Sequence, residues 1–288
     1  MKNFLFLILI LISSTICCQN IAPIAFLGND FKYYKGATLL IDPANKGMFR
    51  MYSKLKYLSV FKISKVLEPR ADYNYTDAQK IKNSEYLVLD IYENPKEMVN
   101  NYGFDNDPIF VLQDIHSKET YYFPYSKVLN FEFPFMVKNL TLPDDYFCNK
   151  IHTYYDEFED NTSYSFGFGY KEDVSVSANK ENGETYYYLR LEGSSLSYKI
   201  REGLFIIFGD GTKLSLPNQK LSVKVGNIHR GTTWYDLSTL VTLDKKTIDK
   251  VIKLGISKYK IGESTKQLTN EQNFLLKEFT SCLYRSTL

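Results

Sequence analysis

The chain has 288 residues, 44% of them hydrophobic and 24% charged, which is the balance of a globular protein with a core of its own. Its formal net charge is only +2, and no basic stretch stands out, which argues against a nucleic-acid-binding protein. Because tyrosine and phenylalanine favour strands, the 24 Tyr and 20 Phe residues predict a mainly β fold.

The first residues have the pattern of a secretory signal peptide. Lys2 precedes the apolar run Phe4–Ile12, which is much shorter than the roughly 20 residues of a membrane-spanning helix. We expect residues 1–18 to be removed, which leaves no transmembrane segment and a secreted or periplasmic protein. The alternative is a lipid anchor at the cell envelope through Cys17 or Cys18, although the residues before both cysteines match a lipobox poorly.

Removal of the signal leaves two cysteines, Cys148 and Cys282. An exported chain meets an oxidising compartment, and this pair brackets the C-terminal half of the sequence. We therefore favour a disulfide between them over two buried thiols.

Residues 19–140 are predicted to form an N-terminal β-rich domain. Its strand candidates are short apolar or alternating runs separated by turn residues: Ile21–Leu27, Thr38–Ile41, Met48–Tyr52, Leu58–Val66, Tyr86–Tyr92, Ile109–Asp114, Thr120–Phe123 and Phe131–Val137. Pro134 favours an edge position for the last of these strands. A strand, a long polar loop and a hairpin together have the layout of a small SH3-like barrel, and we expect the domain to end at Thr141–Asp145.

Residues 146–288 are predicted to form a β-sandwich or curled sheet that packs against a C-terminal helix. The clearest hairpin joins Leu204–Phe208 to Thr212–Leu216 through Gly209-Asp210-Gly211, and a second one turns at Asn182-Gly183. The remaining strand candidates in this half are Leu196–Ile200, Leu221–Val225, Leu237–Leu243 and Ile256–Ile261.

Two helices are predicted near the C-terminus. Asp244 is a suitable N-cap and Gly255 a suitable C-cap for a helix over Lys245–Leu254. Thr269 precedes a second helix, Asn270–Tyr284, whose apolar residues recur at helical spacing.

Parts of this half resemble a known group of proteins. The stretches Phe147–Ile151, Asp156–Phe158 and Phe208–Thr212, followed by the strand and helix that end at Cys282, are similar to a pattern in uncharacterised secreted proteins of the Bacteroidota. The resemblance covers about residues 146–285. It implies export and a shared β-rich module, and it implies no activity.

Common catalytic and metal-binding motifs are missing from the sequence. It has no HExxH pair, GxSxG elbow, P-loop or CxxC, so we predict no cofactor and favour a protein that is not an enzyme. The acidic residues Asp156, Glu157, Glu159 and Asp160 are a weak calcium candidate, since calcium takes several carboxylate oxygens. The run lacks the glycine and closing glutamate of an EF-hand, so a solvated loop is the favoured interpretation.

Aromatic side chains are the remaining candidates for a ligand site. Trp234 and Tyr235 follow a polar loop, and Tyr186 and Tyr188 share one face of a strand. Exposed rings on a β-sheet stack on sugars through their apolar faces, whereas packing in the core is the competing and more common role.

The function expected from the sequence is that of an exported, non-enzymatic binding or surface-structural module. Polysaccharide, or another protein of the envelope, is the expected partner, and nucleic acid is not. A secreted hydrolase of glycans or peptides is the alternative.

Overall fold

A computed structural model describes residues 21–43, 48–50, 75–77, 83–93, 108–127, 133–166, 173–229 and 232–287. The chain divides into two compact units, residues 1–142 and 143–288. The prediction of a mainly β fold with a helical C-terminus is confirmed. The predicted signal peptide, with Cys17 and Cys18, and the strand candidate Leu58–Val66 lie outside the described residues.

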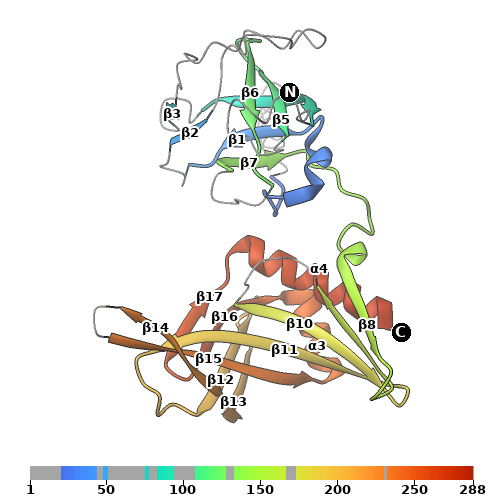
Figure 1. The fold of residues 1–288 in the computed structure, drawn as a ribbon, viewed down its shortest axis with the longest axis vertical. Coiled ribbons are helices and arrows are strands. Elements are labelled where there is room, and N and C mark those ends of the chain that lie inside the picture. Colours follow the sequence, from blue (N-terminus) through green and yellow to red (C-terminus); the bar gives the residue numbers. More distant parts are fainter. Residues whose placement is uncertain are drawn as a thin grey trace, which may run out of the picture. The chain divides into compact units, whose positions relative to one another are not determined.

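The first unit is built on a five-stranded antiparallel sheet (Figure 1). In the order β6-β5-β4-β1-β7, its strands are Thr120–Pro124, Ile109–Asp114, Glu85–Tyr92, Thr38–Ile41 and Phe135–Lys138. A separate pair joins β2 (Met48–Arg50) to β3 (Tyr75–Asp77). Strand β7 is an edge, as Pro134 predicted, and β6 is the other edge, so no closed barrel is found among the described strands.

The predicted first strand, Ile21–Leu27, is wrong apart from a single bridge between Ile21 and Lys138. The chain instead leads into the 3-10 helix η1 (Gly28–Tyr34). The hydroxyl of Tyr34 accepts from the N–H of Leu27 at 2.9 Å and donates to the carbonyl of Ala25 at 2.5 Å. These bonds satisfy backbone groups that a strand would have paired with a neighbour.

An aromatic cluster fills the core of this unit. The rings of Phe110 and Tyr125 stack with their centroids 4.8 Å apart, and Tyr34 and Phe133 lie within 5.6 Å of Tyr125. All four side chains are buried. The large share of Phe and Tyr in the sequence therefore serves packing in this unit.

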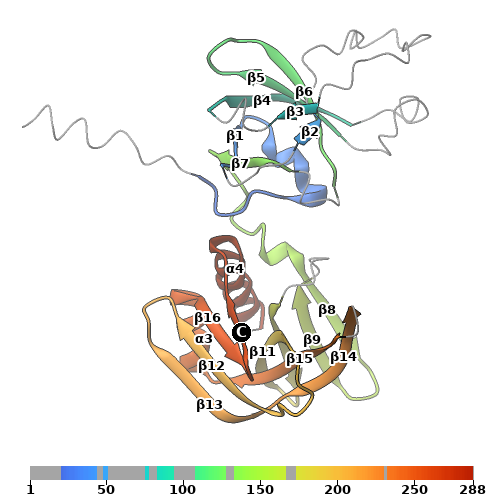
Figure 2. The ribbon, with the colours of Figure 1, turned by 90° about the vertical axis from the view of Figure 1, so that its left-hand side faces the viewer.

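The second unit holds two antiparallel sheets that face each other (Figure 2). The six-stranded sheet has the order β14-β15-β11-β10-β9-β8, with strands Ser222–His229, Thr232–Leu243, Glu184–Ser195, Val174–Glu181, Asn161–Phe166 and Ile151–Asp156. The four-stranded sheet has the order β13-β12-β16-β17, with strands Lys213–Lys220, Glu202–Phe208, Ile256–Ile261 and Ser264–Gln267.

Both predicted helices of this unit are present. Helix α3 (Lys245–Leu254) begins where the carboxylate of Asp244 accepts from the N–H of Thr247 at 2.8 Å, and Gly255 ends it with a φ of 67°. Helix α4 (Asn270–Thr287) packs against α3 and against the six-stranded sheet at β10. Neither described helix is long and apolar enough to cross a membrane.

The predicted disulfide joins Cys148 to Cys282. Cys148 begins the 3-10 helix η3 (Cys148–Lys150), and Cys282 lies buried on α4. The bond therefore ties the start of the second unit to its last helix across 134 residues. Arg285 lies beside it, with Nη2 3.2 Å from the Cys148 sulfur and 3.3 Å from that of Cys282.

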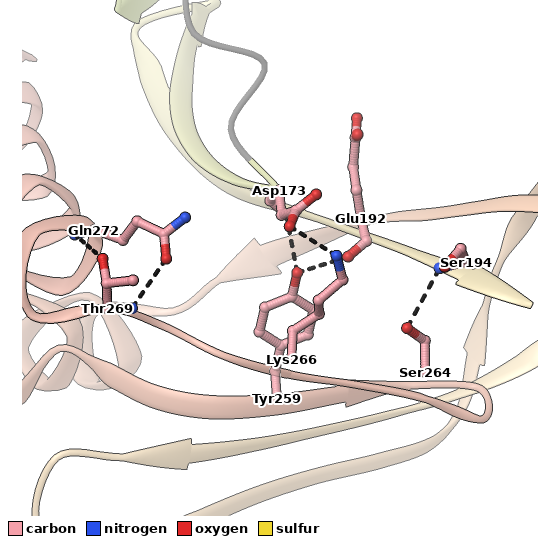
Figure 3. Close-up of polar contacts among 8 residues, drawn as sticks. All are labelled: Asp173, Glu192, Ser194, Tyr259, Ser264, Lys266, Thr269 and Gln272. Atoms are coloured by element: carbon pink, nitrogen blue, oxygen red, sulfur yellow. Dashed lines mark hydrogen bonds and ion pairs between the residues drawn. The ribbon is translucent and has the colours of Figure 1, made fainter. Parts of the chain in front are cut away.

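Polar contacts hold the two sheets together on their facing sides (Figure 3). The buried Tyr259 on β16 donates its hydroxyl to the carbonyl of Glu192 on β11 at 2.6 Å, and that of Asp173 is 3.2 Å away. Burial raises the pKa of Tyr259, so this hydroxyl stays a donor at physiological pH. Lys266 on β17 forms an ion pair with Asp173 at 2.9 Å.

A glycine allows the close approach of these strands. A Cβ at Gly193 on β11 would lie 2.5 Å from Ile261 Cγ2 and 2.9 Å from Ser264, closer than carbon atoms pack. The absence of a side chain there lets the N–H of Ser194 donate to the hydroxyl of Ser264 at 3.3 Å. Strand β11, in the interior of the six-stranded sheet, is thus held in place by contacts with β16 and β17 on its covered side.

The predicted strand Leu196–Ile200 is a turn instead. Ser195 accepts from the N–H of Ser197 through its hydroxyl at 2.9 Å, and Ser197 accepts from Lys199 at 3.2 Å. Such local bonds from serine side chains compete with strand pairing, which explains why an alternating pattern did not form a strand.

Candidate functional site

The six-stranded sheet has one covered and one open side. Leu189 and Leu191 on β11 and Val241 and Leu243 on β15 are buried toward the four-stranded sheet. Because side chains alternate along a strand, their neighbours in sequence point the other way. We call that other side the tyrosine face; its central strand β11 contributes Tyr186, Tyr188 and Arg190.

The strand register places a row of four side chains across this face. Tyr154 on β8 pairs with Ser163 on β9, Ser163 pairs with Asn179 on β10, and Asn179 pairs with Tyr186 on β11. Tyr154 is 66% exposed and Tyr186 is 39% exposed. Three strand spacings separate the two rings, which corresponds to about 14 Å. Small groups that donate and accept hydrogen bonds lie between them.

A hydrogen bond restrains the Tyr186 ring. Its hydroxyl donates to Glu184 Oε2 at 2.6 Å, and this bond to the carboxylate raises the pKa of Tyr186. Glu184 lies two residues earlier on the same face of β11. The ring is therefore held by its hydroxyl while its surface stays accessible.

Adjacent rows continue the face along β11. Tyr188 is half-buried and lies opposite Ser177 on β10 and Thr242 on β15. Arg190, one row further, lies opposite Leu240, which is 53% exposed. Arg190 also forms an ion pair with Glu192 at 2.6 Å. The face thus combines exposed rings with hydroxyl, amide and charged groups.

The structure separates the other two predicted ligand residues. Trp234 is 41% exposed and shares the parity of Thr242 on β15, so it belongs to the tyrosine face. It is eight residues from Thr242, which puts it roughly 26 Å along the strand from the row of Tyr188. Tyr235 points to the opposite side, where its ring lies 6.0 Å from that of Tyr198. Tyr235 is therefore not part of the tyrosine face.

Sequence reasoning missed Tyr154, because the stretch before the acidic run was not recognised as a strand. The available signal was the residue types, since Thr153, Tyr154 and Tyr155 all favour strands. Tyr155 is 57% exposed, yet it points to the side opposite Tyr154.

The acidic run forms the turn between β8 and β9. The carboxylate of Asp156 accepts from the N–H of Phe158 at 2.9 Å, and Asp160 accepts from the hydroxyl of Tyr155 at 2.9 Å. Of the weak calcium candidate, Asp156 with Glu157, Glu159 and Asp160, the two aspartates therefore accept hydrogen bonds within this turn. No three potential ligand side chains come together for a metal among the residues that the structure describes.

A hollow of about 490 Å³ lies along α3. Its walls come from that helix alone: Lys245, Lys246, Asp249, Lys250, Lys253 and Leu254. Ligand sites normally converge from several elements around a largely apolar cavity, so we regard this hollow as a basic surface groove.

Comparisons of the chain with protein-family models, curated proteins and solved structures found no match. The resemblance to secreted proteins of the Bacteroidota stays a prediction.

Proposed function

We propose that this chain is an exported, non-enzymatic binding module that takes a glycan on the tyrosine face. The observation that carries the proposal is the row Tyr154–Ser163–Asn179–Tyr186, which offers two exposed rings with polar groups between them. A sugar has an apolar ring surface and a rim of hydroxyls, and this row has a matching partner for each.

The rigidity of the sheet supports this proposal. Each strand of the row except β8 is paired with a neighbour on both sides. On its covered side, β11 is also hydrogen-bonded to Tyr259 and Ser264 of the four-stranded sheet. A ligand that binds to a preformed surface loses less free energy to the ordering of side chains. The position of Trp234 on the same face favours an extended polymer over a single sugar, since the polymer can contact both ends.

Four carboxyl groups do not have the raised pKa that the general acid of a glycosidase needs. In the described residues, the carboxyl pKa values that move clearly, those of Asp90, Asp114, Asp210 and Asp244, are all lowered. A general acid of a glycosidase needs a raised pKa. A secreted hydrolase stays the alternative to the binding module.

The proposal is tested by a pull-down of the full chain on a panel of dissolved and insoluble polysaccharides, with analysis of the supernatant for released sugar. We expect retention on at least one polysaccharide and no released product. Released sugar would favour the hydrolase over the binding module. A chain that is retained on none of the polymers would refute the glycan proposal.

A further inference from the structure

The four-stranded sheet also has an open side, which faces away from the six-stranded sheet. Phe205 and Ile207 on β12 point to this side, since Leu204 and Ile206 are buried on the other. The register pairs Phe205 with Lys260, and Ile207 with both Lys258 and Lys213. We call this surface the lysine face, defined by these two apolar residues and three lysines.

Nothing in the described part of the unit covers the lysine face. Phe205 is 42% exposed, although it is a large apolar side chain at the centre of a sheet. Lys213, Lys258 and Lys260 are exposed, and none of them is in an ion pair with a described residue. An apolar centre with a positive border is typical of a surface that receives an acidic partner with an apolar residue.

The same chain carries a segment with the complementary chemistry. At the tip of the β8–β9 hairpin, Phe158 is 92% exposed and lies between Glu157 and Glu159. Neither glutamate is in an ion pair with another described residue. The tip is also preformed, since the carboxylate of Asp156 accepts from the backbone N–H groups of Phe158 and Glu159. We call residues 156–160 the acidic tip.

The charge of the second unit is unevenly distributed along its sequence. Residues 143–200, which include the acidic tip, contain eleven acidic and five basic side chains, whereas residues 201–268 contain six acidic and twelve basic ones. A chain with two oppositely charged surfaces attracts further copies of itself in a head-to-tail orientation.

We propose that the acidic tip of one copy of this chain docks on the lysine face of another copy. Phe158 covers Phe205 and Ile207, while Glu157 and Glu159 approach Lys213, Lys258 and Lys260. The acidic tip and the lysine face of one chain do not cover each other, because Phe158 and Phe205 are both exposed in the folded unit. The contact joins two different surfaces, so it produces either a two-fold dimer with two reciprocal contacts or rings and open chains.

The association is weak and sensitive to salt. A five-residue tip buries much less than the roughly 1,200–2,000 Å² of a stable interface. Its charged border is screened at high ionic strength, where the Debye length falls from about 10 Å at 0.1 M to about 3 Å at 1 M. Association also presents several tyrosine faces together, which increases avidity for a polymer, but the inference does not depend on that function.

Sedimentation velocity of the full chain, over a range of concentrations in low and high salt, tests the contact. One variant reverses the tip (Glu157→Lys with Glu159→Lys), and another reverses the face (Lys258→Glu with Lys260→Glu). We expect the wild-type chain to associate in low salt and each variant alone to associate at least 10-fold more weakly. An equimolar mixture of the two variants should regain association, because each tip then meets a face of opposite charge.

A matched control reverses two exposed lysines of the same unit that belong to neither surface (Lys199→Glu with Lys224→Glu) and should associate like the wild type. Three results would overturn the proposal: a wild-type chain that stays monomeric in low salt, variants that associate like the wild type, or a mixture that fails to regain association. A monomer that sediments with phosphatidylserine vesicles through Lys258 and Lys260 would assign the lysine face to a lipid surface instead.

Discussion

The disulfide between Cys148 and Cys282 makes the most quantitative prediction about stability. In the chain-entropy model, a cross-link across 134 residues stabilises the folded unit by ~5 kcal/mol. For a unit of the size of residues 143–288, this corresponds to a decrease of about 15 °C in melting temperature when the bond is lost. The loss has a structural cause as well, because Cys282 lies on α4 and Cys148 on η3, so the bond holds the last helix against the start of the unit.

Calorimetry of the full chain, with and without reductant, and of the double variant Cys148→Ser with Cys282→Ser measures this effect. The first unit serves as an internal control, because neither cysteine of the disulfide belongs to it. We expect reductant and the double variant to move the transition of the second unit by the same amount and to leave the other transition in place. A decrease under about 1 kcal/mol would refute the reasoning, and it would mean that α4 docks without the covalent link.

Three further predictions concern single residues. Gly211→Ala should destabilise the β12–β13 hairpin by about 1 kcal/mol in urea unfolding, because Gly211 has a φ of 83°, which alanine rarely adopts. No atom lies within 4 Å of an added Cβ, so the loss comes from the backbone alone, and Gly211→Asn should cost less. Tyr259→Phe should lower the free energy of unfolding by about 1–3 kcal/mol, since it leaves the part-buried carbonyl of Glu192 without this donor; an unchanged urea midpoint would contradict this. Burial alone would raise the pKa of Asp114, but hydrogen bonds from Ser117 and His116 outweigh it, so the pKa is lowered. The ionised carboxylate therefore stabilises the hairpin at pH values above the pKa of the unfolded chain, which is about 3.8. That contribution should be lost as the pH falls through the folded pKa, and Asp114→Asn should make the melting temperature of the first unit less dependent on pH between 5 and 3, roughly the window of this titration.

Local signals explain which elements could be predicted. The β12–β13 hairpin and helix α3 follow from Gly211, Asp244 and Gly255, each of which acts on residues next to it in sequence. The β8–β9 hairpin was not predicted, because nearly all of β8 is exposed and its sequence lacks the apolar alternation that identifies a half-buried strand.

The candidate site depends on the register between strands, which no short stretch of the sequence reveals. Tyr154 and Tyr186 are 32 positions apart and share a row only because β8, β9, β10 and β11 pair in one particular alignment. A shift of one residue in any pairing would move one of the rings to the opposite side. For the same reason, Trp234 and Tyr235 are neighbours in sequence but belong to different sides of the sheet.

The tyrosine face is tested most directly by the neighbours Tyr154 and Tyr155, which are both exposed but point to opposite sides of β8. The measurement is the dissociation constant of Tyr154→Ala and of Tyr155→Ala for the polysaccharide that the wild-type chain retains best. A lost stacking contact of about 1.4 kcal/mol predicts roughly 10-fold weaker binding for Tyr154→Ala and unchanged binding for Tyr155→Ala. Equal losses in both variants, or a loss only in Tyr155→Ala, would contradict the assignment of the binding site to the tyrosine face.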